Sequence, residues 1–394
     1  MRKLLLLVIL LCFSHASLAA NALTQFKRLK NASLLVVDES GTELETRNAD
    51  TTYVPASTVK VLTALIALDT FGEDYRFRTE FYLNPTDNRL WIVGKGDPYL
   101  VSEEIDLIIN ALRSQSLPIV DGIGIDSTYF SEPIEIDGQS STRNPYDAPV
   151  GALAANFNTI KVKVRNKKIY AGERQTPLTP LARTMGWKLG SGTHRINLGS
   201  ATKGPRYFGE LFYEKMKLAG MGGKRNISTG KLPDTAMFIM THENSRTLAD
   251  VVSAMLKYSN NFVANQLYLM LGAEYHQAPA SMEKSALVFE QYINNNFNWN
   301  NYAINEGAGL SRRNQLSARQ LVDVLELFKK YQHLMPAQDK RAKVHAKTGT
   351  LNNVNTYAGY FHKDGQTRTF AMLINQKVNR DFRKQLANYL QRNR

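Results

Sequence analysis

The alternation of hydrophobic and polar positions predicts a chain of short strands and amphipathic helices. Apolar residues recur at helical spacing within residues 55–68 and predict a helix there. Residues 77–81 alternate, a turn-forming segment follows at 84–88, and an apolar run returns at 90–93, which predicts a hairpin. One more strand is expected to end at residues 36–38, and others are expected at 123–125, 160–164, 195–198, 344–350, 357–362 and 369–375. Further helices are expected at 103–113, 208–218, 248–258, 286–294, 318–331 and 380–390.

The order of these elements predicts an α+β protein in which one domain interrupts another. Residues 131–207 are rich in Gly, Pro, Ser, Thr and Asn and carry only short strand-like pieces. Helical patterns flank this stretch on both sides, and no internal repeat is visible. The apolar positions of the last helix favour a face packed on the protein over a membrane anchor.

The N-terminus has the pattern of a secretory signal peptide. Arg2 and Lys3 precede a ten-residue apolar run, and the small residues after it allow cleavage after Ala19 or Ala20. The alternative is a buried N-terminal helix. Cys12 is the single cysteine and lies in the apolar run, so we expect a mature chain without disulfides or thiolate zinc sites.

Composition narrows the class of protein further. The 394 residues are 43% hydrophobic and 21% charged, which excludes a disordered tail, a collagen-like repeat and a small disulfide scaffold. No segment after the signal is long and apolar enough to predict a membrane span. The formal net charge of +14 favours peripheral association with an anionic membrane or wall polymer. Because the basic residues are scattered, we expect no nucleic-acid binding.

Ser57 and Lys60 are the first candidates for chemistry, because residues three apart share one face of a helix. A serine hydroxyl is a poor nucleophile unless a base removes its proton. Lysine can be that base only when burial or another cation lowers the pKa of its amine. The same Ser-x-x-Lys spacing occurs at Ser200, Ser228 and Ser281, so the motif alone is a weak signal.

A second motif, Ser259-Asn260-Asn261, follows a predicted helix. The Ser259 hydroxyl can relay a proton, and the Asn261 amide can bind a lysine and a substrate carbonyl. Asparagine is also common as a cap at the C-terminal end of a helix. Taken alone, the motif therefore favours a structural role.

A third motif, Lys347-Thr348-Gly349-Thr350, lies in a predicted strand. Alternation places Lys347 and Gly349 on one face, and Gly349 leaves room for a substrate backbone. Lys347 and the two threonine hydroxyls can form a pocket for a carboxylate. The alternative is an edge-strand lysine followed by a turn.

Together and in this order, the three motifs are similar to those of the penicillin-interacting serine enzymes. Over essentially the whole mature chain, the sequence resembles the class C low-molecular-mass penicillin-binding proteins of the penicillin-binding protein 4 type, a family of D-alanyl-D-alanine carboxypeptidases and endopeptidases. Class A β-lactamases have far fewer residues between the first two motifs than separate Ser57 from Ser259 here. The excess length implies an inserted domain.

Three more segments carry the resemblance. Residues 94–98 resemble the family's Gly-Gly-Gly-Asp-Pro segment, residues 124–130 its strand ending in Asp-x-x-x-Phe, and residues 306–312 its Asp-Gly-Ser-Gly-Leu-Ser-Arg segment. The chain departs from the family where Asn260 replaces the commoner Asp and where Glu306 replaces Asp. These departures bear on substrate preference more than on chemistry.

The resemblance implies an α+β fold with a serine DD-peptidase/β-lactamase-like transpeptidase domain, in which helices flank an antiparallel sheet. We expect a signal peptide at 1–19, a discontinuous catalytic domain at 20–76 and 206–394, and an inserted β-rich domain at 77–205. It also implies roles for the motif residues. Ser57 attacks, Lys60 takes its proton, and Lys347 helps to keep Lys60 neutral by repulsion. Ser259 passes a proton to the leaving amine, and Asn261 holds Lys60 and the substrate amide.

The substrate contacts follow from the same resemblance. The backbone amides of Ser57 and Thr350 are expected to form the oxyanion hole, and Lys347, Thr348 and Thr350 to hold the terminal carboxylate beside Gly349. Three other residues resemble a family side pocket for the free end of a diamino-acid side chain: Asp126, Phe130 and Arg312.

The implied activity is hydrolysis of the D-Ala-D-Ala terminus of peptidoglycan stem peptides, or of cross-links, in the periplasm, together with covalent binding of β-lactam antibiotics. No cofactor or metal is called for, and the seven histidines show no metal-ligand spacing. Two alternatives remain open: a β-lactamase-like hydrolase, and a non-catalytic basic protein that binds the cell wall.

Overall fold

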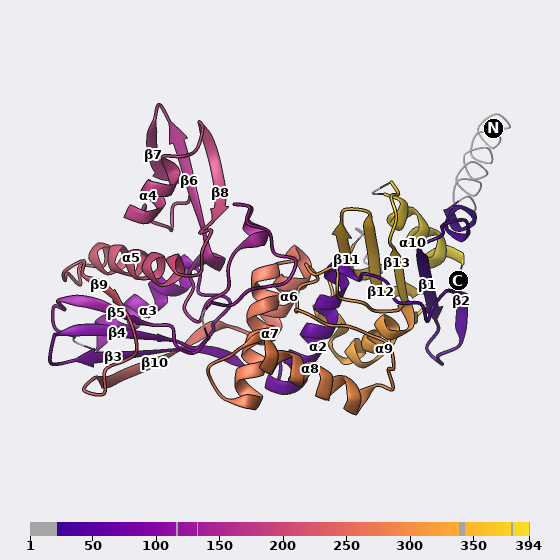
Figure 1. Cartoon of the computed structure of the whole chain (residues 1–394), viewed down its shortest axis with the longest axis horizontal. Helices are drawn as coiled ribbons and strands as arrows, with labels where there is room; N and C mark the ends of the chain where they lie inside the picture. The colour runs from indigo at the N-terminus through magenta and orange to yellow at the C-terminus, as the bar shows by residue number, and fades with distance from the viewer. Residues whose placement is uncertain (1–21, 116, 132, 339–342, 380, 394) are drawn as a thin grey trace. The chain divides into compact units, whose positions relative to one another are not determined.

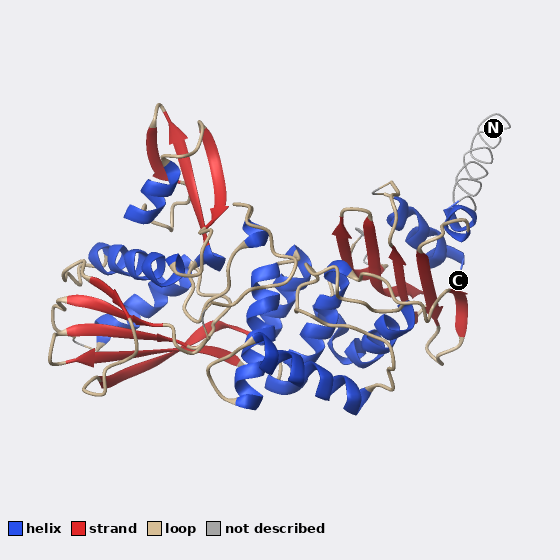
Figure 2. Cartoon of the chain, in the orientation of Figure 1, coloured by secondary structure: helices blue, strands red, loops and turns tan. Residues whose placement is uncertain are grey.

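The computed structural model describes residues 22–115, 117–131, 133–338, 343–379 and 381–393. The predicted signal peptide and Cys12 lie outside the described residues. The described chain forms helices and three sheets (Figures 1 and 2), as the α+β prediction requires.

The strands are β1 (Ala32–Val37), β2 (Glu43–Arg47), β3 (Arg76–Asn84), β4 (Arg89–Gly94), β5 (Gly122–Asp126), β6 (Thr159–Arg165), β7 (Lys168–Ala171), β8 (Gly192–Asn197), β9 (Ile227–Thr229), β10 (Met237–Thr247), β11 (Val344–Leu351), β12 (Val354–Lys363) and β13 (Gln366–Ile374). The α-helices are α2 (Lys60–Phe71), α3 (Ser102–Ser114), α4 (Pro180–Gly186), α5 (Lys203–Leu218), α6 (Leu248–Tyr258), α7 (Asn261–His276), α8 (Met282–Asn296), α9 (Ala318–Phe328) and α10 (Phe382–Asn393). Short 3₁₀ helices are η1 (Ala56–Val59), η2 (Pro145–Asp147), η3 (Asn156–Asn158) and η4 (Lys329–Leu334).

The described chain divides into two compact units. The terminal unit holds residues 22–65, 256–259 and 293–393, and the central unit holds residues 66–255 and 260–292. In the larger sheet of the central unit, β3 is the first strand in the chain, and the last two strands in the chain, β9 and β10, come after residue 205. The expected domain boundaries at 76/77 and 205/206 stay predictions.

The terminal unit is built on an antiparallel sheet with the order β11-β12-β13-β1-β2. Because side chains alternate along a strand, Leu34 and Val36 of β1 point to one face, where they share a core with Phe382 and Leu386 of α10. The apolar face of the last helix is therefore packed on the protein, as expected. A second helix, α9, also contacts the sheet: the Tyr360 hydroxyl of β12 donates to a backbone carbonyl of α9 at 2.6 Å.

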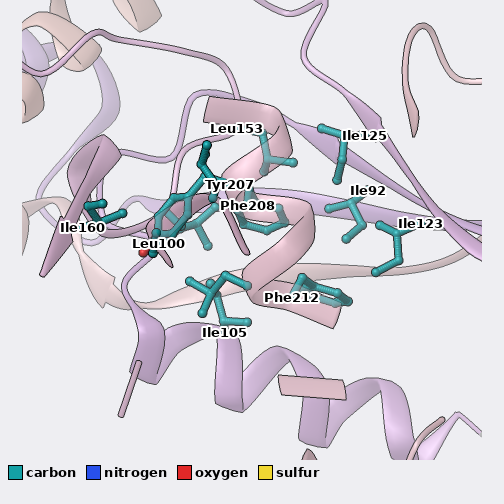
Figure 3. Packing of buried hydrophobic residues seen from close by; sticks show 14 of the residues in the cluster. Ile92, Leu100, Ile105, Ile123, Ile125, Leu153, Ile160, Tyr207, Phe208 and Phe212 are labelled. Carbon is teal, nitrogen blue, oxygen red and sulfur yellow. The ribbon is translucent and has the colours of Figure 1, made fainter. Parts of the chain in front are cut away.

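The central unit contains two sheets. The larger has the order β10-β3-β4-β5-β9, with β4–β5 and β5–β9 parallel, and the smaller is antiparallel with the order β7-β6-β8. Figure 3 shows Ile92 and Ile125 of the larger sheet packed with Phe208 and Phe212 of α5. The hairpin predicted from the alternation of residues 77–93 is β3–β4.

Two of the differences from the sequence prediction concern helices. The helix expected over 55–68 is divided: residues 56–59 form η1, and α2 begins at Lys60 and ends at Phe71. The helix α7 was not expected, because every residue from Phe262 to Ala273 is buried and a helix buried on all sides lacks the polar face that reveals its period. Within the described residues, no helix is both long enough and apolar enough to cross a membrane.

The core of the central unit generates a stability prediction. Phe212 is fully buried between Phe81 and Phe208, with ring centroids 6.0 Å and 5.8 Å away. Phe212→Ala should lower the free energy of unfolding by about 3–5 kcal/mol, because it removes contacts and leaves a cavity. Met237→Ala, at a side chain that is 57% exposed, is the control. Urea unfolding followed by circular dichroism checks this, and equal shifts for both variants would contradict it.

Candidate active site

Ser57 lies on the short 3₁₀ helix η1, which leads directly into α2. Side chains at i and i+3 eclipse one another in such a helix, so Ser57 and Lys60 share a face. The Lys60 amine donates to the Ser57 hydroxyl with 3.1 Å between Nζ and Oγ. Ala56 has a φ of +46°, so the chain turns through the left-handed region just before the serine. The predicted pair is thus within hydrogen-bond distance, on a 3₁₀ turn.

The environment of Lys60 favours an amine that gives up its proton. The side chain is fully buried and donates a second hydrogen bond to the carbonyl of Ala308. Burial lowers the pKa of Lys60 to about 7, although the Glu306 carboxylate acts in the opposite direction. Much of the amine is therefore neutral near pH 7, and a neutral amine can accept the Ser57 proton.

The Ala308 carbonyl is held in place by a loop that folds around the buried carboxylate of Glu306. This carboxylate accepts hydrogen bonds of 2.7–3.2 Å from the backbone N–H groups of residues 308–311. The loop also packs closely on the turn that carries Ser57: a Cβ added at Gly309 would lie 2.0 Å from the carbonyl oxygen of Ala56. In the sequence, Glu306 stands out only as a departure from a family segment, because its burial is a tertiary property.

Lys347 brings a second buried amine to the terminal unit. Its Nζ donates to the Ser259 hydroxyl at 2.8 Å and to the carbonyl oxygen of Thr348 at 2.6 Å. Burial lowers the pKa of Lys347 well below its usual value, and the charges of Lys60 and Arg383 lower it further. Burial is the largest cause of the low pKa of both lysines. The charge of Lys60 contributes to the low pKa of Lys347, and the expected effect of Lys347 on Lys60 stays a prediction.

Ser259 occupies the turn between α6 and α7, with a φ of +54°. Because its hydroxyl oxygen accepts from Lys347, its own proton remains able to donate. Asn260 has the capping role that the structural alternative suggested, but at the start of the next helix: its side chain accepts from the N–H of Val263 at 3.2 Å. The motif therefore combines a cap with a positioned hydroxyl.

Two other predicted site residues bind backbone carbonyls. The Asn261 side-chain amide, at the start of α7, donates to the carbonyl of Tyr146 at 3.1 Å. The Arg312 guanidinium donates to the carbonyl of Asn352 at 2.6 Å. The expected contact of Asn261 with Lys60 and with the substrate amide stays a prediction.

Asp126 and Phe130 are both buried in the central unit. One Asp126 oxygen accepts from the N–H and the hydroxyl of Thr128 at 2.8 Å and 2.7 Å, and the other accepts from the N–H of Leu232 at 2.7 Å. The carboxylate thus connects the end of β5 to the loop at Thr128 and to the loop at Leu232. Arg312 lies in the terminal unit, so a side pocket shared by all three residues stays a prediction.

The strand β11 lies directly against the turn that carries Ser57. A Cβ added at Gly349 would lie 2.1 Å from the hydroxyl of Thr356 and 2.9 Å from the backbone nitrogen of Ser57. The Thr356 hydroxyl in turn donates to the carbonyl of Pro55 at 2.7 Å. This close approach of the chain to itself explains a glycine at 349. The room that Gly349 was expected to leave for a substrate backbone stays a prediction. The oxyanion hole formed by the Ser57 and Thr350 amides stays a prediction.

Sequence reasoning missed Arg383. Its guanidinium, on α10, donates to the carbonyl of Gly349 at 2.7 Å and to the hydroxyl of Thr350 at 2.9 Å. No motif marks this residue, because its position depends on how the last helix packs on the sheet. Among the residues that the structure describes, no group of three or more His, Cys, Asp or Glu side chains is placed to hold a metal ion.

The chain is similar to proteins of known activity and to proteins of known structure. The chain is 24% identical to the D-alanyl-D-alanine carboxypeptidase of Actinomadura sp. (strain R39) over 84% of this chain and 74% of that protein. Its fold matches the crystal structure of penicillin binding protein 4 (dacB) from Haemophilus influenzae with a TM-score of 0.77 and 18% identity, over 94% of this chain and 98% of that one. The α+β prediction is thereby confirmed.

A second solved structure is more distant. Bd3459, a predatory peptidoglycan endopeptidase from Bdellovibrio bacteriovorus, matches with a TM-score of 0.53 and 18% identity, over 88% of this chain and 86% of that one. It has also been solved in a form acylated by penicillin G. The sequence profile of the D-Ala-D-Ala carboxypeptidase 3 (S13) family matches residues 15–186 and 192–393. The resemblance seen in the motifs is therefore confirmed, and the chain belongs to the D-Ala-D-Ala carboxypeptidase 3 (S13) family.

Proposed function

We propose that this chain is a serine DD-peptidase that hydrolyses the bond between the two terminal D-alanines of peptidoglycan stem peptides. One observation carries the proposal: the Ser57 hydroxyl lies 3.1 Å from a buried lysine amine whose pKa is about 7. A serine next to such a base can attack a carbonyl carbon near neutral pH. Membership of the S13 family supplies the substrate class.

Acylation begins when Ser57 Oγ attacks the carbonyl carbon and its proton passes to Lys60 Nζ. The carbonyl oxygen gains negative charge, and the backbone amides of Ser57 and Thr350 are the proposed donors to it. Losing one such donor typically costs about 10²–10³ in rate. The Gly349 backbone supports this role, because it allows β11 to approach the nitrogen of Ser57.

The tetrahedral intermediate collapses when the C–N bond breaks and the second D-alanine leaves as an amine. Its nitrogen needs a proton, and the Ser259 hydroxyl is the proposed donor because its oxygen already accepts from Lys347. The proton that Lys60 took from Ser57 then passes to Ser259 and restores the Ser259 hydroxyl. Water hydrolyses the remaining ester, which releases the shortened peptide and regenerates Ser57.

The substrate of a carboxypeptidase carries a free carboxylate beside the scissile bond. Lys347, Thr348 and Thr350 are the proposed residues that hold it. Lys347 is suited to this role because a carboxylate next to a buried amine favours its charged form. Asn261 is the proposed partner of the substrate amide, and Asp126, Phe130 and Arg312 are the proposed side pocket for a diamino-acid side chain.

Cleavage of cross-links is a second candidate activity, because both reactions break a bond next to a D-alanine. The endopeptidase name of Bd3459, which shares the fold, favours including it. Mass analysis of the products from purified muropeptides separates the two: loss of one alanine marks the carboxypeptidase, and conversion of dimers to monomers marks the endopeptidase.

We also propose that the enzyme works in the periplasm, beside an anionic membrane or wall polymer. The apolar run at residues 4–13 with its basic start supports export, and the net charge of +14 supports the association. Cell fractionation with an antibody against the mature chain tests the location. Recovery of the processed protein in the cytoplasmic fraction would reject it.

The nucleophile is tested with labelled penicillin. Wild type should become covalently labelled and Ser57→Ala should not, because the ester forms on the Ser57 hydroxyl. Ser228→Ala removes a serine from another Ser-x-x-Lys sequence and should keep the label. Gel fluorescence and intact mass detect the adduct. Labelling of the Ser57 variant would reject this residue as the nucleophile, and an acyl-enzyme that hydrolyses within seconds would favour the β-lactamase alternative.

The base is tested by the pH dependence of kcat/KM. Activity should rise as the pH passes through about 7, because only neutral Lys60 accepts a proton. Glu306→Gln removes the anion that raises the pKa of Lys60, so the acid limb should move to lower pH. Glu290→Gln, at an exposed carboxylate, should leave it in place. If the pH at which kcat/KM rises is unchanged or higher in Glu306→Gln, Lys60 is not the base.

The role of Lys347 is tested by a pair of substrates. Lys347→Met should lower kcat/KM for a peptide that ends in a free carboxylate by about 10–100-fold, the usual range for one charge-assisted hydrogen bond. A matched peptide ending in a carboxamide should lose less. Equal losses on the two peptides would remove Lys347 from carboxylate binding and leave it a role with Ser259.

A further inference from the structure

The side chain of Arg383 connects the last helix to the strand that carries the Lys-Thr-Gly motif. Its Nη1 donates to the carbonyl of Gly349 at 2.7 Å, to the hydroxyl of Thr350 at 2.9 Å and to the carbonyl of Thr356 at 3.5 Å. All of these residues belong to the terminal unit. One guanidinium therefore touches two neighbouring strands where the proposed carboxylate pocket lies.

The helix that carries Arg383 is anchored independently of it. Phe382, Leu386 and Leu390 are buried in the core beneath the sheet. Burial of such side chains contributes about 1.5–3 kcal/mol each, so the helix should stay docked when the guanidinium is replaced. Lys384, the next residue, is exposed and offers a matched position for removing a positive charge from the same helix.

The hydrogen bond to Thr350 fixes the direction in which its hydroxyl can act. A guanidinium has donors and no acceptor, so the Thr350 oxygen must be the acceptor. The hydroxyl proton then remains to donate to another group. Thr350 is exposed, and a carboxylate oxygen beside β11 is the acceptor that the proposed function places there.

The charge of Arg383 is also permanent, since the guanidinium stays protonated at any physiological pH. The neighbouring amine behaves differently. Lys347 faces the positive charges of Lys60 and Arg383 and the hydroxyl of Ser259, and its pKa is lowered by burial and by both charges. In the absence of a bound anion, Arg383 therefore stays positively charged over a wider pH range than Lys347.

From this geometry we propose that Arg383 is a positioning residue for carboxylate recognition: it holds the Thr350 hydroxyl as a donor and adds a fixed positive charge beside Lys347. The inference rests on the proposed function, because it concerns how the same site selects a substrate with a free terminal carboxylate. It adds α10 to the elements that build the site.

The test compares Arg383→Gln, Arg383→Lys and the control Lys384→Gln on two D-Ala-D-Ala peptides, one ending in a carboxylate and one in a carboxamide. Arg383→Gln should raise KM for the carboxylate peptide by about tenfold or more, with a smaller change in kcat, because a charge-assisted contact is lost. The carboxamide peptide should be handled as by wild type. Arg383→Lys should recover part of the loss, and Lys384→Gln should match wild type.

A purely structural role would give equal losses on both peptides, and unchanged kinetics would mean no role; either result overturns the inference while the proposed function stands. The rate of labelling by penicillin, which carries its own carboxylate, is the second measurement. Should wild type cleave neither peptide, the proposed function fails, and a slower labelling of Arg383→Gln than of Lys384→Gln still decides the role of Arg383. If wild type is neither active nor labelled, both proposals fall.

Discussion

The buried amine of Lys60 lies against the Ser57 hydroxyl, and the neighbouring residues of the terminal unit compensate for its burial. An ammonium group at full burial is unfavourable unless other groups compensate. Here the Ser57 hydroxyl and the Ala308 carbonyl accept from the amine, and a carboxylate lies near enough to act on it. The balance lowers the pKa of the amine to about 7, which would allow it to accept a proton near neutral pH. A fully exposed lysine in the same position would stay charged and be useless as a base.

The Glu306 loop can be understood in the same terms. A buried carboxylate that accepts four backbone N–H groups has its hydrogen-bonding capacity met locally. It can therefore stabilise the shape of the loop while its charge acts on Lys60 from a distance. Because the loop presents the Ala308 carbonyl to the amine, the Glu306 side chain shapes the surroundings of Lys60 and also partly offsets the effect of burial on the pKa of Lys60.

The elements and site residues that could be predicted from the sequence are those determined by residues close together in the chain. The Ser57 and Lys60 spacing, the β11 strand and the helix at 248–258 could be predicted because neighbouring residues in the chain determine them. The helix α7 gave no periodic signal because it is buried on all sides. The strand β10 was missed because most of its residues are at least partly exposed and lack a regular apolar alternation. Arg383 contacts a strand that is distant in the chain, and the charge of Glu306 acts on Lys60, which is also distant in the chain. The sequence alone did not reveal either interaction.

Two glycines allow the backbone of other segments to lie against the turn that carries Ser57. Gly309 meets the carbonyl of Ala56, and Gly349 meets the nitrogen of Ser57, each closer than any side chain would allow. A side chain at either position would collide with the turn that carries Ser57, so neither position can change without moving the proposed nucleophile. Variation that alters which substrates or inhibitors the protein binds is instead expected at side chains such as the exposed Thr350 and its neighbour Arg383.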